Sequence, residues 1–132
     1  MTELGAAPAG NPVHAALDRE DLAPTTRAVL ELLLLGLEPA EMARLEVADL
    51  RLEGGRHGVL AISPRPTLTR YGVRRRRYVT LSAGARVALE RLLDGNPSRS
   101  RSLLVSRRGA ALSVHGVRSV IARALDDGRH TG

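Results

Sequence analysis

The chain has 132 residues, of which 43% are hydrophobic, so it is long enough for one domain with a hydrophobic core. It contains no cysteine, which excludes disulfides and thiolate chemistry, and no apolar run reaches the roughly 20 residues of a membrane-spanning helix. Its net charge of +6 is uneven: residues 1–66 carry 6 Arg and 10 Asp or Glu (net −4), whereas residues 67–132 carry 14 Arg and 4 Asp or Glu (net +10). This asymmetry predicts an anionic partner for one face, with nucleic acid the leading candidate ahead of acidic lipid or protein.

The N-terminal segment is rich in Ala, Pro and Gly, which predicts a flexible arm over residues 1–13, followed by a single domain over residues 14–132. The segment lacks the basic and apolar regions of a secretory signal, so we expect a cytoplasmic protein. The next stretch, LDREDL (17–22), predicts a short helix that is capped by Asp18.

Two more helices are predicted before the sequence pattern changes. TTRAVLELLLLG (25–36) begins with a threonine cap and ends at Gly36, and its apolar side chains cover most of the helix circumference. We therefore expect a central helix in which Leu33 and Leu34 are almost fully buried. EPAEMARLEVADL (38–50) predicts a shorter helix with a proline in its first turn.

The apolar pattern then changes to a period of two residues, which is typical of β-strands. Strands are predicted at 49–55, 57–62 and 76–81, and the long connection SPRPTLTRYG (63–72) predicts a protruding hairpin. Alternate side chains of a strand face opposite sides, so core-facing arginines of the run 74–77 must escape burial or bind an anion.

Two helices are predicted in the remaining third of the chain. SAGARVALERLLDG (82–95) predicts a helix capped by Ser82, and SVHGVRSVIARALDDG (113–128) predicts a final helix capped by Ser113. Between them, LLVS (103–106) is expected to be extended. The apolar side of the first of these helices is predicted to consist of Val87, Leu89, Leu92 and Leu93.

Three stretches follow, in order, the motifs of one known family. GLEPAEMARLEVADL (36–50) is similar to a box G-L-R-x-x-E, RYVTLSAGARVAL (77–89) to R-x-V-P-L before a helix, and LLVSRRGAALS (103–113) to L-F-x-S-x-x-G-x-x-L-S. Over roughly residues 17–127 the sequence therefore resembles the catalytic domain of tyrosine recombinases, the phage-integrase-like family. The resemblance implies an α+β domain, mainly helical, with a small three-stranded antiparallel sheet.

Members of this family cleave DNA with a tyrosine nucleophile, assisted by two arginines, a lysine and two His-type residues. In this sequence the position of the first arginine holds Glu38, while the neighbouring family glutamate is retained as Glu41. The position of the hairpin lysine falls within residues 72–74, which contain no lysine. A carboxylate at position 38 repels a phosphate, so we predict an inactive protein with no catalytic residue.

The C-terminal part of the family pattern is also incomplete in this sequence. Asp126 holds the leading histidine position of the H-x-L-R-H box, which Arg129 and His130 match only in part. The nucleophile is expected beyond the last residue, and Tyr71 and Tyr78 belong to the hairpin instead. The prediction is therefore a recombinase-like domain that is truncated at its C-terminus.

Arginines of the hairpin and of the turn before the last helix are the predicted DNA-binding residues, since the family hairpin lies against DNA. The alternative is a solvated charge run that protects an edge strand from aggregation. The predicted set is Arg65, Arg70, Arg74, Arg75, Arg76, Arg77, Arg107 and Arg108.

Other polar residues have structural explanations. Glu41, three residues after Glu38, is interpreted as an acidic residue in the first turn of a helix, where the helix dipole favours it. The four histidines lack the i,i+3 or i,i+4 pairs of a helical metal site, so we expect no metal and no cofactor.

The sequence thus predicts an inactive integrase-like protein that binds duplex DNA, as an accessory or regulatory factor in DNA recombination or integration. Only two tyrosines and no Phe or Trp are present, which favours a duplex over a single strand. One alternative is a protein-interaction module, in which the acidic first half binds a second copy or a recombinase partner. The other is RNA binding by the same hairpin.

Overall fold

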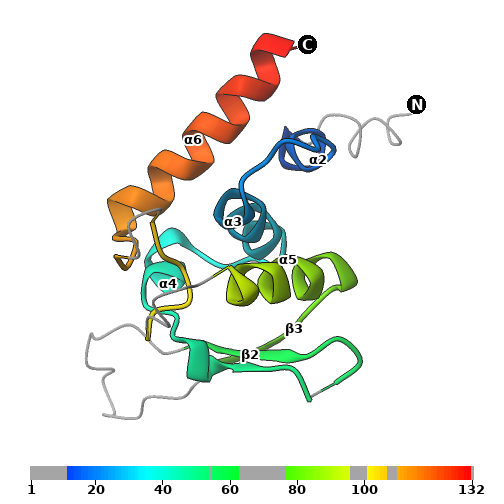
Figure 1. Cartoon of the computed structure of the whole chain (residues 1–132), viewed down its shortest axis with the longest axis vertical. Helices are drawn as coiled ribbons and strands as arrows, with labels where there is room; N and C mark the ends of the chain where they lie inside the picture. Colours follow the sequence, from blue (N-terminus) through cyan, green and yellow to red (C-terminus); the bar gives the residue numbers. More distant parts are fainter. Residues whose placement is uncertain (1–11, 54, 63–76, 96–100, 107–109, 132) are drawn as a thin grey trace.

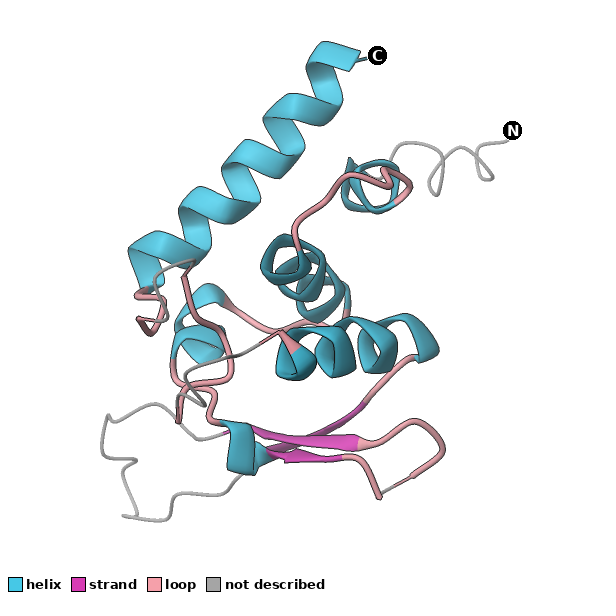
Figure 2. Cartoon of the chain, viewed as in Figure 1, coloured by secondary structure: helices cyan, strands magenta, loops and turns pink. Residues whose placement is uncertain are grey.

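The computed structural model describes residues 12–53, 55–62, 77–95, 101–106 and 110–131, with side chains up to Asp126. It is mainly helical with a small antiparallel sheet, as predicted (Figures 1 and 2). None of the described helices has the length and apolar character needed to cross a membrane. The elements are α2 (Pro12–Leu17), α3 (Pro24–Leu34), α4 (Pro39–Ala43), a 3-10 turn η1 (Val47–Asp49), β1 (Leu50–Arg51), β2 (Val59–Ile62), β3 (Arg77–Thr80), α5 (Ala83–Asp94) and α6 (Val114–Thr131).

The first helix lies earlier than the sequence predicted. The helix expected at residues 17–22 is absent, and α2 occupies Pro12–Leu17 instead. Val13 and Ala16 are buried against Leu30 of α3 and Ala124 of α6, so apolar contacts select this segment. The predicted arm therefore reaches two residues into α2, and its residues 1–11 lie outside the described part.

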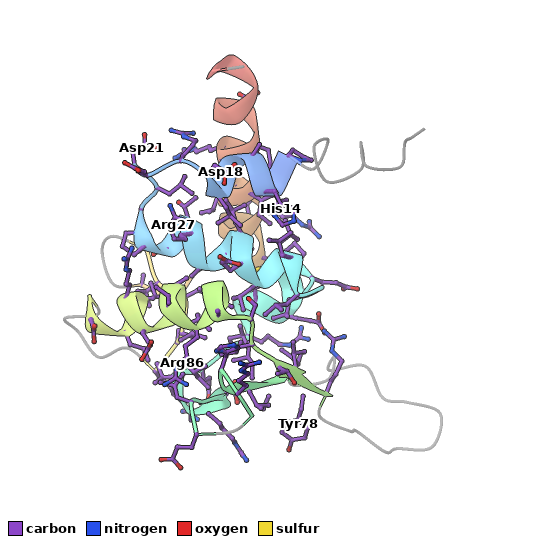
Figure 3. All side chains as sticks on the ribbon, turned by 90° about the vertical axis from the view of Figure 1, so that its right-hand side faces the viewer. His14, Asp18, Asp21, Arg27, Tyr78 and Arg86 are labelled. Carbon is purple, nitrogen blue, oxygen red and sulfur yellow. The ribbon has the colours of Figure 1, made fainter. Side chains whose placement is uncertain are left out.

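The polar residues that follow α2 form a loop rather than a helix. The guanidinium of Arg27 in α3 donates hydrogen bonds to the backbone oxygens of Leu17 and Arg19, and Arg19 pairs with Asp21 at 3.0 Å. The pair with Arg19 lowers the pKa of Asp21. These contacts satisfy backbone acceptors at the end of α2, so no further helical turn is needed to satisfy them. Figure 3 shows Asp18, Asp21 and Arg27 around this loop.

Helix α3 is central, as predicted, but its leucines are not equally buried. The helix ends at Leu34, and its C-cap residue Leu35 is followed by Gly36 at φ 95°, a left-handed conformation that favours glycine. Leu30 and Leu32 are fully buried, whereas Leu33 and Leu34 are only partly buried, contrary to our expectation. Leu33 packs against both hydrophobic clusters and Leu34 only against the smaller one beside α2.

The start of α3 also differs from the prediction in its cap. Pro24 begins the helix, and Ala23 stands at the cap position without a side-chain hydrogen bond. The hydroxyl of Thr25 donates instead to the backbone oxygen of Val105 at 3.3 Å. This threonine therefore ties α3 to the extended segment 101–106 rather than capping its own helix.

A strand forms within each of the three predicted stretches, and together they make one antiparallel sheet in the order β1-β2-β3. The first strand is much shorter than the predicted 49–55, because only Leu50–Arg51 is strand and a turn follows at residues 52–53. Leu60 of β2 pairs with Leu50 of β1 and Val79 of β3, and these three side chains pack on the core side of the sheet. In Figure 1 helix α5 lies between this sheet and α3. The sheet is thus covered by helices on one face.

Helix α5 is capped by Ser82, whose hydroxyl accepts the backbone N–H of Ala85 at 3.1 Å, as predicted. Leu89 and Leu92 are buried, and Leu93 is partly buried, in agreement with the predicted apolar side. Val87 is 48% exposed, so its assignment to that side was wrong. At about 100° per residue, Val87 lies about 160° around the helix from each of Ala85 and Leu89, which face the core.

Residues 101–106 and 110–113 lead from the core to α6, the last helix. The backbone of Leu103 donates to Leu45, and Val105 forms an antiparallel bridge with Ala111. Ser113 accepts the N–H of Gly116 at 3.1 Å at the start of α6, which confirms the predicted cap. Helix α6 packs against α2, α3 and α4.

Candidate nucleic-acid interface

Only one of the eight predicted DNA-binding arginines lies in the described part of the chain. Arg77 begins strand β3 and is exposed. Nothing is shown of the other seven, which fall outside the described residues: Arg65, Arg70, Arg74, Arg75, Arg76, Arg107 and Arg108. The candidate interface is therefore built around the position where Arg77 enters the sheet.

Strand register places Arg77 on the side of the sheet that faces the core. The residue that pairs with Arg77 on the neighbouring strand β2 is Ile62, which is buried in the main hydrophobic cluster. Residues directly opposite each other in an antiparallel pair project to the same face. Since β3 is an edge strand, the long side chain extends past the core, and 52% of it is exposed.

The guanidinium of Arg77 has an anionic partner on a different element. Its Nη2 lies 3.2 Å from Oε1 of Glu41 in α4, and the Glu41 side chain is only 13% exposed. Alternation along the strand predicted that a core-facing arginine needs an anion or an escape from burial. Arg77 has both, because one end of its guanidinium meets Glu41 while half of its side chain is in solvent.

Glu41 is fixed by the start of its own helix. The same oxygen, Oε1, accepts the backbone N–H of Glu38 at 2.9 Å, and the Glu38 side chain faces the backbone of Glu41 in a capping box. Pro39 occupies the first helical position, where a missing N–H has no cost. The interpretation of Glu41 as a first-turn residue is thus confirmed.

Glu38, at the position of the family's first arginine, ends the connection between α3 and α4. It is the N-cap residue of α4, it has an extended backbone (φ −85°, ψ 153°), and it is exposed. Leu37, just before it, is buried in the main cluster and anchors this connection. Glu38 therefore lies at the surface beside Glu41, one residue from a rigid core contact.

Tyr78 and Arg77 project to opposite faces of the sheet. The partner of Tyr78 on β2 is Ala61, and Tyr78 is 56% exposed. Figure 3 shows Tyr78 directed away from the helices. Together with Leu52 and Val59 it lines a shallow hollow on the uncovered face of the sheet. Tyr71, the second tyrosine, lies outside the described residues.

The other ion pairs of the described residues are spread over the surface. Arg101 pairs with Glu46 at 3.1 Å, and Arg86 with Glu90 at 3.6 Å. Exposed pairs of this kind contribute little to stability. Within the same described part, no three His, Asp or Glu side chains come together in a way that could hold a metal ion.

Sequence reasoning did not find the contact between Glu41 and Arg77. The two residues are 36 positions apart, and the alternation of β3 indicated only that Arg77 needed an anion. The one sequence feature that pointed to Glu41 was its match to the glutamate of the G-L-R-x-x-E box. It could not identify its partner without the placement of α4 beside the start of β3.

Comparisons with known proteins agree with this fold. No protein-family model and no curated protein sequence matches the chain. Among solved structures, the XerA recombinase superimposes with a TM-score of 0.70 over 90% of this chain, at 17% sequence identity. The match covers 41% of the XerA chain, so this chain spans less than half of that protein's length. The chain has a recombinase-like fold, and the predicted fold class is confirmed.

Proposed function

We propose that this recombinase-like domain binds duplex DNA without cutting it. The observation that carries the proposal is the surface position of Arg77 at the start of β3, directly after the run of arginines at 74–76. The second half of the chain, with a net charge of +10, provides the attraction that a DNA backbone requires. A recombinase-like fold makes DNA the expected anionic partner.

The amino-acid composition favours a duplex as the ligand. Proteins that bind single strands stack the bases on aromatic side chains, and this chain has two tyrosines and no Phe or Trp. Arginine guanidinium groups bind phosphates through paired hydrogen bonds, and such contacts carry no sequence information. We therefore expect binding that depends strongly on salt and weakly on DNA sequence.

Glu38 supports the proposal that DNA is not cleaved. Phosphoryl transfer needs cationic groups directed at the charge that develops on the phosphate. The resemblance places the family's first catalytic arginine at this position, where the chain carries an exposed carboxylate instead. Such a domain would occupy a recombination site without reacting and so act as an accessory or regulatory factor.

Two measurements test this function together. Fluorescence anisotropy with a labelled duplex, the matching single strand and RNA of the same sequence, each over a salt series, identifies the ligand. A nicked suicide duplex, followed by denaturing electrophoresis, detects any covalent protein–DNA adduct. We expect the duplex to bind most tightly and no adduct to form.

Other outcomes would contradict the proposal in distinct ways. Tighter binding to RNA than to duplex DNA would identify RNA as the ligand instead. No affinity for any nucleic acid at low salt would favour the protein-interaction alternative. A phosphotyrosine adduct at Tyr71 or Tyr78 would show that the domain cleaves DNA.

A further inference from the structure

We infer that Glu41 is a positioning residue for DNA: its carboxylate holds Arg77 so that the remaining guanidinium donors face a phosphate. This inference rests on the proposed function and assigns a role to an acidic residue inside a surface that binds an anion. The juxtaposition that carries it is the contact of Arg77 Nη2 with Glu41 Oε1 at 3.2 Å.

Glu41 is suited to hold another side chain because it is itself held. Its Oε1 accepts the backbone N–H of Glu38 at 2.9 Å, and only 13% of the side chain is exposed. The helix that carries it is anchored by Met42, which is fully buried in the main cluster. The carboxylate therefore has a fixed position relative to the core, and Arg77 takes its orientation from it.

Arg77 retains binding capacity after this contact. A guanidinium has five N–H donors in a planar arrangement, and the contact with Glu41 uses one at Nη2. Half of the Arg77 side chain is exposed, so the other donors can reach a ligand in solvent. A long arginine side chain loses rotamer freedom when it binds, and restraint by Glu41 removes part of this cost beforehand.

Neutralising Glu41 should change the affinity for DNA in opposite directions, depending on whether Glu41 orients Arg77 or acts only through its charge. If Glu41 acted only through its charge, its neutralisation would strengthen binding to a polyanion, because a repulsive charge is removed. If Glu41 orients Arg77, neutralisation releases the guanidinium and weakens binding. The direction of the change therefore separates the two roles.

Glu41→Gln is the informative variant because it removes the negative charge that attracts Arg77, while the new amide oxygen can still accept the Glu38 N–H. We expect the duplex affinity to fall about two- to fivefold, the range that an exposed ion pair contributes. The slope of log K against log salt should become shallower by up to about 0.9, which corresponds to one phosphate contact. Fluorescence anisotropy with a duplex over a salt series measures both quantities.

A double-mutant cycle with Arg77→Ala shows whether the effect passes through Arg77. In the Arg77→Ala background, Glu41→Gln should leave the affinity unchanged or raise it slightly, because only the repulsive charge remains to be removed. A purely structural role for Glu41 would instead weaken binding equally in both backgrounds. Circular dichroism and thermal unfolding of all variants show whether the fold is retained.

The control variant is Glu90→Gln in α5. Glu90 also pairs with an arginine, Arg86, whose Nη1 donates to the backbone oxygen of Leu52 at 3.0 Å. Arg86 (labelled in Figure 3) therefore contacts the chain just after β1, whereas Arg77 lies on β3 at the opposite edge of the sheet. Its neutralisation should not weaken duplex binding.

The possible results separate the inference from the proposed function. If the wild type does not bind duplex DNA, both fail. If the wild type binds but Glu41→Gln binds equally well or more tightly, the positioning role is wrong and the function stands. Weaker binding that depends on Arg77 supports the inference.

Discussion

The packing of α3 against α5 and the contact of α4 with β3 join distant parts of the chain by different forces. Between α3 and α5 the contacts are apolar, and Leu32 and Leu89 are fully buried in the main cluster. Between α4 and β3, Glu41 and Arg77 form an ion pair in which the arginine side chain is half exposed. Apolar packing stabilises the fold, whereas the ion pair at the surface sets the direction of a side chain.

Substitutions within α5 test the apolar half of this comparison and should have the largest effect. Leu89→Ala should lower the free energy of unfolding by about 2–5 kcal/mol, because it leaves a cavity in the core. Val87→Ala, in the same helix but at a position that is 48% exposed, should change it by less than about 0.5 kcal/mol. Urea unfolding measures both, and similar losses for the two variants would contradict the packing of α5.

Substitutions at two glycines with positive φ test two connections of the fold: Gly36 lies between α3 and α4, and Gly58 lies between β1 and β2. Gly58 (φ 105°) precedes β2, and a Cβ there would lie 3.2 Å from the backbone of Arg51 and Leu52, so Gly58→Ala should cost about 1–3 kcal/mol. Gly36 (φ 95°) has open space around it, so Gly36→Ala should cost only the conformational strain, about 1–2 kcal/mol. Chemical denaturation that ranks Gly36→Ala as the more harmful would contradict the tight turn at Gly58.

A substitution at Glu38 tests the charged surface around α4 and β3, and the quantity it should change is the affinity for DNA rather than stability. Glu38→Ser removes the carboxylate but keeps a good N-cap, so the fold should be retained while duplex affinity rises by up to about fivefold. Glu53→Ser, which removes an exposed carboxylate from the turn after β1, is the matched control and should have a smaller effect. Equal effects, measured by anisotropy, would mean that only net charge matters.

Substitution of Glu31 in α3 should have the smallest effect, which is a change in how stability depends on pH. Burial raises the pKa of its carboxyl, while the charges of Arg27 and His14 oppose the shift. Since the folded state favours the protonated form, the cost of ionisation is present above the raised pKa and disappears as the pH falls below the ordinary one.

Glu31→Gln should therefore raise the melting temperature at pH 7 by less than about 4 °C. The difference from the wild type should vanish at about pH 3, where the carboxyl is protonated in both states. Thermal unfolding of both proteins at the two pH values measures this, and a gain that persists at pH 3 would exclude burial of the charge as its cause.

The order of the elements and the position of the sheet could be predicted because apolar spacing and glycine positions are local properties of the sequence. Ser82 and Ser113 were correctly identified as caps for the same reason. The predicted helix at residues 17–22 failed because contacts of Val13 and Ala16 with α3 and α6 determine where α2 forms. Burial of Leu33 and Leu34 was overestimated, since a leucine run does not show which side of a helix lacks a neighbour.

The candidate interface could be predicted less completely than the fold. Charge segregation identified the arginine run, and the family pattern identified Glu38 and Glu41 as neighbours in one helix turn. The partner of Arg77 depends on where α4 lies relative to β3, which is a tertiary relationship between residues 36 positions apart. No local pattern in the sequence contains that information.

Duplex affinity across a salt series, for the wild type and a variant with alanine at positions 74–77, tests the DNA-binding function most directly. Four lost phosphate contacts should make the slope of log K against log salt shallower by up to about 3.6, with the fold retained by circular dichroism. A control variant with the same net charge replaces four exposed arginines elsewhere, Arg51, Arg56, Arg91 and Arg123. We expect the control to bind more tightly than the variant at 74–77 and to keep most of the wild-type slope. Unchanged affinity and slope in a folded variant at 74–77 would contradict DNA binding by these arginines.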